Sequence, residues 1–265
     1  NRMRVCDPRP FLKWAGGKGQ LLGEFEARLP RAVKEGRVSA YVEPFAGGGA
    51  VYFHITSKYA FDDCHIFDTN EDLILAYTVV RNDVDDLIEV LRDMETTYLN
   101  LDAEKREEFY YTVRREYNKE RSTIQLNNYS KAWIQRAADL IFLNKTCFNG
   151  LFRVNSEGSF NVPAGRYRNP KILHEELLRS DSELLENTGI HHDDFSSCAP
   201  FVDEKTFVYF DPPYRPLNRS SSFTSYSKGG FGDDEQRRLA AFYRDLDARG
   251  AMLMLSNSDP KNQDP

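Results

Sequence analysis

The sequence predicts an α/β fold built around a mostly parallel sheet. Short apolar runs alternate along the chain with segments of helical periodicity, which is typical of parallel strands joined by helices. A glycine-rich turn follows one of these runs, and an aspartate with two prolines and a tyrosine follows another. Open α/β sheets hold their ligands at the carboxyl ends of the strands, so both features indicate a site at that edge.

The amino-terminal part of the sheet is predicted from a strand, a glycine turn and a helix. We expect residues 41–45 to form the strand, Gly47-Gly48-Gly49 the turn and residues 50–59 the helix. A second strand at residues 64–67 ends at Asp68, and an acid about 20 residues beyond a glycine turn is well placed to bind ribose hydroxyls. The glycines lack the Gly-x-Gly-x-x-Gly spacing, which argues against a nicotinamide cofactor, and a purely structural turn is the alternative.

Residues 70–143 are mostly helical in pattern, with Asp68 or Thr69 as the expected cap. The pattern changes at residues 144–167, where Asn149-Gly150 and Glu157-Gly158 turns separate short aromatic and β-branched runs and predict a β-hairpin. The sheet then resumes with strands near residues 190–192, at 206–210 and at 252–255, and a helix at 233–249. We therefore expect a core of residues 1–80 and 172–265, interrupted by an insert of residues 81–171. Because a sheet that ended at the last strand would leave it near an edge, we expect further chain beyond residue 265.

Composition argues against several classes of protein. No apolar run approaches the roughly 20 residues of a membrane span, and no signal-peptide core follows the polar start, so we expect a cytoplasmic protein without membrane contacts. The four cysteines lie far apart and the five histidines form no ligand pattern, which predicts reduced thiols and no bound metal. One copy of each motif indicates that a monomer suffices.

Charge is distributed unevenly along the chain. The net charge of -6 argues against a protein that coats nucleic acid by bulk electrostatics. Five basic residues and one acid nevertheless lie between residues 144 and 171, whereas residues 181–204 carry seven acids and no Lys or Arg. An acidic body with one basic segment suits a protein that reads a particular nucleic-acid sequence.

The Asp211-Pro212-Pro213-Tyr214 segment suits chemistry on an aromatic amine. Such an amine is a poor nucleophile because its lone pair is delocalised into the ring, so acceptors aimed at its two hydrogens favour the reactive state. The Asp211 carboxylate and the Pro212 carbonyl can supply them, and Tyr214 can stack on a base flipped out of a duplex. The alternative for Asp211 is a turn or helix-cap residue.

Two further segments suit the same crevice. Within residues 11–18, Trp14 would attract a cationic sulfonium to its ring face, although a buried Trp14 and a solvated Lys18 are the alternative. Asp194 and Phe195 follow the strand near residue 190 and offer a carboxylate for an exocyclic amine and a ring beside a purine. Asp194 would equally suit the N-cap of a helix.

These motifs together resemble the Dam-type DNA adenine-N6 methyltransferases, including the DpnII-like restriction-system enzymes. The resemblance implies an α/β, Rossmann-like S-adenosylmethionine-dependent methyltransferase sheet with an inserted helical and β-hairpin target-recognition domain. It also implies methyl transfer from S-adenosylmethionine to adenine N6 in double-stranded DNA, at GATC, by base flipping. Family chains continue past the Leu255-Ser256-Asn257-Ser258 segment through another helix and closing strands. The matching segments are Phe11 to Lys18, Glu43 to Gly49, Asp68 to Asn70, Asn149 to Asn155, Phe160 to Tyr167, Asp211 to Tyr214, Phe223 to Tyr226 and Leu255 to Ser258.

The resemblance further implies a role for individual residues. In the cofactor site it places Trp14, Lys18, Phe45, Gly47, Gly49, Asp68, Asp194, Phe195 and Asp211. In the catalytic set it places Asp211, Pro212 and Tyr214. On the DNA it places Lys13, Phe148, Asn149, Leu151, Arg153 and Pro163, and we expect Arg166 to hold a phosphate. Arg153 suits a guanine edge, whereas Leu151 and Pro163 suit a thymine methyl or ordinary hairpin packing.

Other functions stay open on the sequence alone. Methylation of cytosine N4 needs the same amine chemistry, but such enzymes more often begin the tetrapeptide with serine. Methyltransferases of protein glutamine begin it with asparagine, and a dehydrogenase would need the other glycine spacing. A DNA-binding homologue that has lost catalysis is a further alternative, against which the intact Asp211 to Tyr214 segment argues.

Overall fold

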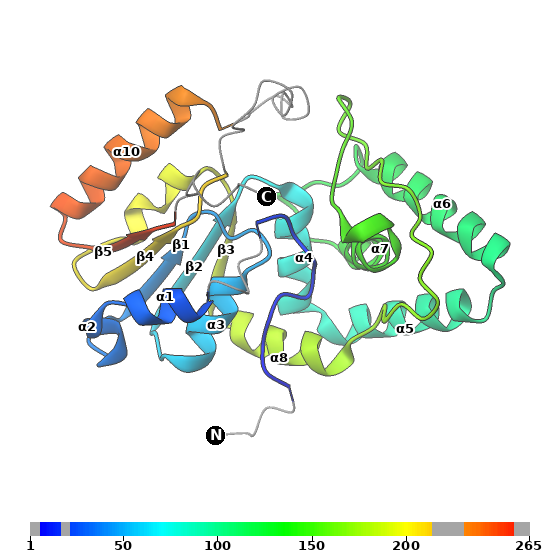
Figure 1. Cartoon of the computed structure of the whole chain (residues 1–265), viewed down its shortest axis with the longest axis horizontal. Coiled ribbons are helices and arrows are strands. Elements are labelled where there is room, and N and C mark those ends of the chain that lie inside the picture. The colour runs from blue at the N-terminus through cyan, green and yellow to red at the C-terminus, as the bar shows by residue number, and fades with distance from the viewer. Residues whose placement is uncertain (1–5, 17–21, 214–230, 257–265) are drawn as a thin grey trace, which may run out of the picture.

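Five parallel strands form the central sheet of the protein, seen here in a computed structural model that describes residues 6–16, 22–213 and 231–256 (Figure 1). The sheet order is β3-β2-β1-β4-β5, and every pair of neighbours is parallel. The predicted α/β fold with a parallel sheet is therefore confirmed. The strands are β1 (Ala40–Glu43), β2 (Asp63–Asp68), β3 (Thr188–His192), β4 (Thr206–Phe210) and β5 (Met252–Leu255).

The strand order reverses beside β1. From β1 the chain moves outward through β2 to β3, and it later returns to the other side of β1 as β4. Ala40 at the start of β1 pairs with both Asp63 and Thr206, so the three strands are level. Doubly wound sheets bind their ligands at the carboxyl ends of the strands where the order reverses, which here means the ends of β1 and β4.

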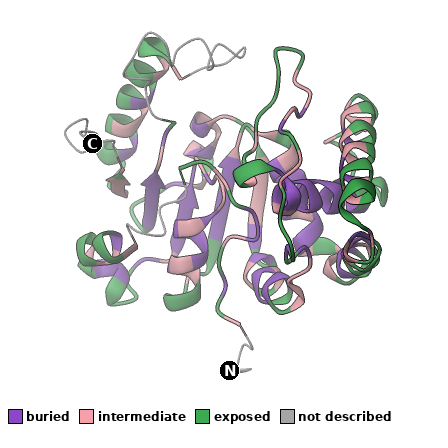
Figure 2. Cartoon of the chain, turned by 45° about the vertical axis from the view of Figure 1, so that its right-hand side comes forward, coloured by how far each residue is buried: buried purple, intermediate pink, exposed green. Residues whose placement is uncertain are grey.

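Buried positions follow one another along the central strands. All four residues of β1 and all five of β4 are buried, as are four consecutive residues of β2. Such strands are near-continuous apolar runs because helices and loops cover both faces of a parallel sheet. Figure 2 shows the buried strands next to the equally buried helix of residues 132–146.

Helices flank the sheet and build the insert, whose members lie to the right in Figure 1. In the insert, α7 packs against α4, α5 and α6. None of the described helices is long and apolar enough to cross a membrane, and the four cysteines are free thiols. The helices are α1 (Leu22–Arg28), α2 (Arg31–Lys34), α3 (Ala50–Lys58), α4 (Glu71–Asn82), α5 (Val84–Leu99), α6 (Ala103–Glu120), α7 (Ala132–Thr146), α8 (Glu175–Leu185) and α10 (Asp233–Ala248), with short 3-10 helices η2 (Phe148–Gly150) and η3 (Phe195–Phe201).

The start of α4 corrects one expectation. The helix is capped by Asn70, whose side-chain oxygen accepts a hydrogen bond from the Leu73 N–H at 3.0 Å, and not by Asp68 or Thr69. Asp68 instead accepts from the Asn70 N–H at 2.8 Å. The expected cap was therefore misplaced by one or two residues, and Asp68 serves the loop at the strand ends.

The predicted hairpin is present but short. It contains two isolated antiparallel bridges, Cys147 with Ala164 and Val154 with Phe160, in place of longer strands. Its turns have the expected left-handed backbone, with φ of 55° at Asn149 and 81° at Gly158. Since few ladder hydrogen bonds form, other groups must satisfy its backbone.

Side chains of α6 satisfy much of that backbone. The Asn118 amide donates to the Phe160 carbonyl at 2.9 Å and accepts from the Phe160 N–H at 2.8 Å. The Tyr110 hydroxyl donates to the Val162 carbonyl at 2.8 Å, and Arg121 donates to the Glu157 carbonyl at 2.6 Å. Side chains of α6 thus fix the hairpin from its inner side.

A buried ion pair joins α7 to α4. Arg136 of α7 is 2% exposed and donates to a carboxylate oxygen of Asp72 in α4 at 2.8 Å. Its guanidinium also donates to the Tyr117 carbonyl at 2.6 Å and lies 4.1 Å from the centre of the Tyr117 ring. Removing one member of such a pair leaves the other charge buried without compensation.

Replacing Arg136 with methionine is therefore expected to lower the free energy of unfolding by about 3–5 kcal/mol, measured by urea denaturation. The matched control is Arg92→Met, because Arg92 pairs with Glu175 through half-exposed side chains and should cost less than about 1 kcal/mol. Adding Asp72→Leu to Arg136→Met should restore much of the loss, since neither charge of the pair then remains. Equal losses for Arg92→Met and Arg136→Met would contradict this interpretation.

Candidate active site

The carboxyl edge of the sheet gathers acidic residues from four strands. Glu43 ends β1, Asp68 ends β2, Asp194 follows β3, and Asp211 directly follows β4. These positions are far apart in sequence, and the parallel sheet brings them to one edge. The edge is therefore suited to bind cationic and hydrogen-bond-donating groups.

The loop between β1 and α3 is fastened to the end of β2. The Gly47 N–H donates to one Asp68 oxygen at 2.9 Å, while the Asn70 N–H donates to the other. Burial raises the pKa of Asp68, and the hydrogen bonds from Asn70 and Gly47 oppose that shift. Because a carboxylate offers about four lone pairs, Asp68 keeps the capacity to accept from a ligand as well.

Gly49 is required by both conformation and space. Its φ of 79° lies in the left-handed region, and a Cβ added there would lie 2.5 Å from the Tyr77 hydroxyl oxygen and 3.0 Å from the Phe53 ring. The Tyr77 hydroxyl itself donates to the Gly47 carbonyl at 2.8 Å. The glycine turn thus has a structural role, whether or not a ligand occupies the loop.

Trp14 is half-buried between the glycine loop and the insert. Its ring stacks on Phe152 with the centroids 4.8 Å apart and the planes 28° apart. A Cβ at Gly48 would lie 3.0 Å from the Trp14 Cβ, and one at Gly47 would lie 3.5 Å from Trp14 Cδ1. Trp14 therefore packs against the core as a partly buried ring, while Lys18 lies outside the described residues.

The end of β4 brings the predicted catalytic segment to the same edge. Asp211 is half-buried, Pro212 is buried, and Tyr214 lies outside the described residues. Glu43 is 2% exposed and accepts a hydrogen bond from the Tyr41 hydroxyl at 2.8 Å. Burial raises the pKa of Glu43 well above its usual value, and the charges of Asp211 and Asp68 add to the shift. Glu43, Asp68 and Asp211 therefore share one electrostatic environment.

No role of its own was expected for Glu43. The available signal was a charged residue at the end of an otherwise apolar strand, because acids are almost never fully buried without a partner. Its burial at the strand ends makes it part of the candidate site.

Asp194 does act as a helix cap, and it also forms an ion pair. It accepts from the Ser196 N–H at 3.0 Å at the start of η3. Arg238 of α10 donates to both of its oxygens, at 2.8 and 2.5 Å. The hydrogen bonds from Arg238 hold the pKa of Asp194 well below its usual range, while burial opposes that shift.

Phe195 lies in an aromatic cluster above the sheet. It is 2% exposed, and its ring centroid is 5.4 Å from that of Phe45, 6.2 Å from Phe231 and 5.6 Å from Phe242. The predicted cofactor residues Phe45 and Phe195 are thus neighbours. Phe195 is thus enclosed by these rings.

The residues predicted to contact DNA are all exposed. Phe148 is 51% and Leu151 43% exposed, which is unusual for large apolar side chains and excludes ordinary hairpin packing for Leu151. Lys13 reaches this surface from the amino-terminal segment, because its Nζ donates to the Asn149 carbonyl at 2.6 Å. The full set is Lys13, Phe148, Asn149, Leu151, Arg153, Pro163 and Arg166.

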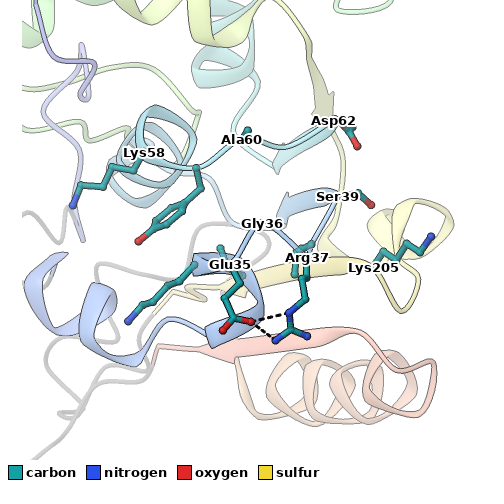
Figure 3. A pocket seen from close by; sticks show the side chains of 12 residues that line it. Glu35, Gly36, Arg37, Ser39, Lys58, Ala60, Asp62 and Lys205 are labelled. Carbon is teal, nitrogen blue, oxygen red and sulfur yellow. Dashed lines mark hydrogen bonds and ion pairs between the residues drawn. The ribbon is translucent and has the colours of Figure 1, made fainter.

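A pocket at the opposite edge of the sheet is a separate feature. It is lined by residues that precede β1, β2 and β4, among them Ser39, Asp62 and Lys205 (Figure 3). Within it Arg37 pairs with Glu35 at 2.6 Å. None of the predicted site residues lines this pocket, and parallel sheets place their ligands at the other edge.

The parallel sheet, the fastened glycine loop and the acidic carboxyl edge define a Rossmann-like methyltransferase fold. A family model described as "D12 class N6 adenine-specific DNA methyltransferase" matches residues 14–264, and the chain belongs to this family. The protein is therefore an adenine-specific DNA methyltransferase.

Curated relatives agree with this assignment. The chain is similar to "Type II methyltransferase M.MjaIII" of Methanocaldococcus jannaschii, with 56% identity over 94% of this chain and 84% of the relative. It is 39% identical to "Type II methyltransferase M1.LlaDCHI" of Lactococcus lactis subsp. cremoris, over 94% of this chain and 81% of that protein. It is 33% identical to "DNA adenine methylase" of Escherichia coli, over 95% of this chain and 81% of that protein.

The left-handed backbone and the close neighbours of Gly49 predict that alanine at this position destabilises the fold. Gly36→Ala should cost about 1–2 kcal/mol of unfolding free energy, because Gly36 has a φ of 69° but nothing within 4 Å of an added Cβ. Gly49→Ala should cost clearly more, since the methyl group also meets Tyr77. Tyr77→Phe in the Gly49→Ala background should recover part of the loss, and a double-mutant cycle by chemical denaturation measures it. Equal losses of unfolding free energy for Gly36→Ala and Gly49→Ala would show that Tyr77 moves away from the added methyl group without cost.

Proposed function

We propose that the enzyme transfers a methyl group from S-adenosylmethionine to N6 of an adenine flipped out of duplex DNA, at GATC. The observation that carries the proposal is the position of Asp211 and Pro212 at the end of β4, beside Glu43 and the loop that Asp68 fastens. This is the switch point of the sheet, where a nucleoside cofactor and a reacting group can meet.

The residues at the carboxyl edge fit the proposed cofactor. Asp68 retains lone pairs for ribose hydroxyls, and the acidic edge attracts the positive charge of a sulfonium. The glycine loop lies next to Trp14, and glycines let a ligand approach the backbone closely. When bound, the cofactor supplies an electrophilic methyl group. We assign its site to Trp14, Lys18, Phe45, Gly47, Gly49, Asp68, Asp194, Phe195 and Asp211.

The catalytic role follows from the acceptors after β4. The Asp211 carboxylate and the Pro212 carbonyl would accept hydrogen bonds from the two N6 hydrogens, which localises the nitrogen lone pair for attack. Pro212 has no N–H, so its carbonyl is its one backbone hydrogen-bonding group. Asp211 can then take the proton that the methylated nitrogen releases. Tyr214 would stack on the extruded base.

Recognition of DNA is assigned to the insert, residues 81–171. Its exposed apolar and basic side chains suit base edges and phosphates, because specific sites combine both kinds of contact. Phe148 and Asn149 would lie next to the gap that the flipped adenine leaves. GATC rests on the resemblance to Dam-type enzymes, and the names of the type II relatives support a role in restriction-modification. We expect a monomer to act on double-stranded DNA.

The test is transfer of labelled methyl from S-adenosylmethionine to three matched duplexes: one with GATC, one with that adenine already N6-methylated, and one with a scrambled site. We expect label on the first duplex alone, recovered as N6-methyladenine. Asp211→Ala should abolish the transfer because an acceptor for the amine is lost, while DNA binding in a gel-shift assay stays near that of the wild type.

Three outcomes would change the proposal. Near-wild-type turnover of Asp211→Ala would remove Asp211 from the mechanism. Label on the scrambled duplex alone would show that the target sequence is not GATC. No label on any duplex while S-adenosylhomocysteine binds would point to another target sequence or to an inactive enzyme.

Arg153 is expected to read a base. It is exposed, and its Nε donates to the Asn161 side chain at 2.8 Å, which holds the guanidinium on the outer side of the hairpin. Arg153→Ala should reduce discrimination between GATC and single-base variants by about 1–3 kcal/mol per lost contact, measured by competition binding. Arg166→Ala is the control, because loss of a phosphate contact should weaken binding to all sequences alike. A uniform effect of Arg153→Ala would make it a phosphate contact too.

A further inference from the structure

Arg238 of α10 contacts both residues of the Asp194-Phe195 pair. Its two terminal nitrogens donate to the two Asp194 oxygens, and its guanidinium carbon lies 4.2 Å from the centre of the Phe195 ring. Glu235, one turn earlier on α10, accepts from the same guanidinium at 2.7 and 3.1 Å. A planar group held at three positions has a fixed orientation.

The two carboxylate oxygens of Asp194 accept different numbers of hydrogen bonds. Its Oδ1 accepts from the Ser196 N–H, the Ser196 hydroxyl and Arg238 Nη1. Its Oδ2 accepts from Arg238 Nη2. Since each carboxylate oxygen has about two lone pairs, the contacts among the described residues saturate Oδ1 and leave one acceptor position on Oδ2.

We propose that Arg238 is a positioning residue of the cofactor site, which holds Asp194 so that the remaining lone pair of Oδ2 accepts from the exocyclic amine of the cofactor's adenine. This inference rests on the proposed function, because it takes Asp194 as a cofactor contact. It adds a residue from α10, and it makes the recognition of adenine, as opposed to another purine, depend on that helix.

The ion pair contributes more to orientation than to stability. Arg238 is 41% and Asp194 34% exposed, and pairs at such exposure stabilise a fold only slightly. Lysine could neutralise the charge of Asp194 but has no planar fork to hold both oxygens. The neighbouring Arg237 offers a matched control, because it is 80% exposed and pairs with Asp234 on its own helix.

The experiment compares binding of S-adenosylhomocysteine and S-inosylhomocysteine by calorimetry. Inosine carries a carbonyl in place of the amine, so the wild type should bind it about 10- to 100-fold more weakly, as expected for a lost hydrogen bond to a charged acceptor. Arg238→Met should reduce that preference to a few-fold, mainly by weaker binding of the adenosyl ligand. Arg238→Lys should be intermediate, and Arg237→Met should match the wild type.

The outcomes separate this inference from the proposed function. If the wild type binds neither ligand, the proposed cofactor site is wrong. If the wild type discriminates and Arg238→Met discriminates equally well, Arg238 has no positioning role and the cofactor site stands. Equal weakening of both ligands in Arg238→Met, with a lower melting temperature, would make Arg238 merely structural. Tighter binding in Arg238→Met would show that Arg238 obstructs the site.

Discussion

The parallel register of the sheet is the constraint on which the rest of the structure depends. Because Ala40 pairs with both Asp63 and Thr206, the neighbours of β1 end together, and the acids that follow them meet at one edge. Burial raises the pKa of Glu43 well above its usual value, and repulsion from the charges of Asp211 and Asp68 adds to that shift. A bound cation would relieve that repulsion, so the fold prepares the edge for a positively charged ligand.

Much of this arrangement was predictable from the sequence. Parallel strands that are covered on both faces are apolar throughout, which made β4 and its terminal Asp211 visible as a motif. The glycine turn was predictable because Gly49 needs a left-handed backbone that few other residues adopt. The turns of the hairpin were predictable for the same reason, at Asn149 and Gly158.

Other features depend on packing that a single sequence does not encode locally. The pairing of Arg238 with Asp194 arises from the position of α10 against η3, which no spacing along the chain indicates. The helix α8 was not predicted, although Leu177, Leu178 and Leu185 form its buried face. Asn70 took the cap that was expected of Asp68 or Thr69, since the Asp68 carboxylate lies at the Gly47 and Asn70 amides.

The Trp14 ring contacts two surfaces at once. One side of it borders the glycine loop, and the other stacks on Phe152 of the insert, while its neighbour Lys13 is bonded to Asn149. A ring shared by two surfaces cannot shift on one side without altering its contacts on the other. Thermodynamic linkage then requires reciprocity. If a ligand beside the glycine loop changes the affinity of the hairpin for its ligand by some factor, the ligand at the hairpin changes the affinity of the loop site by the same factor.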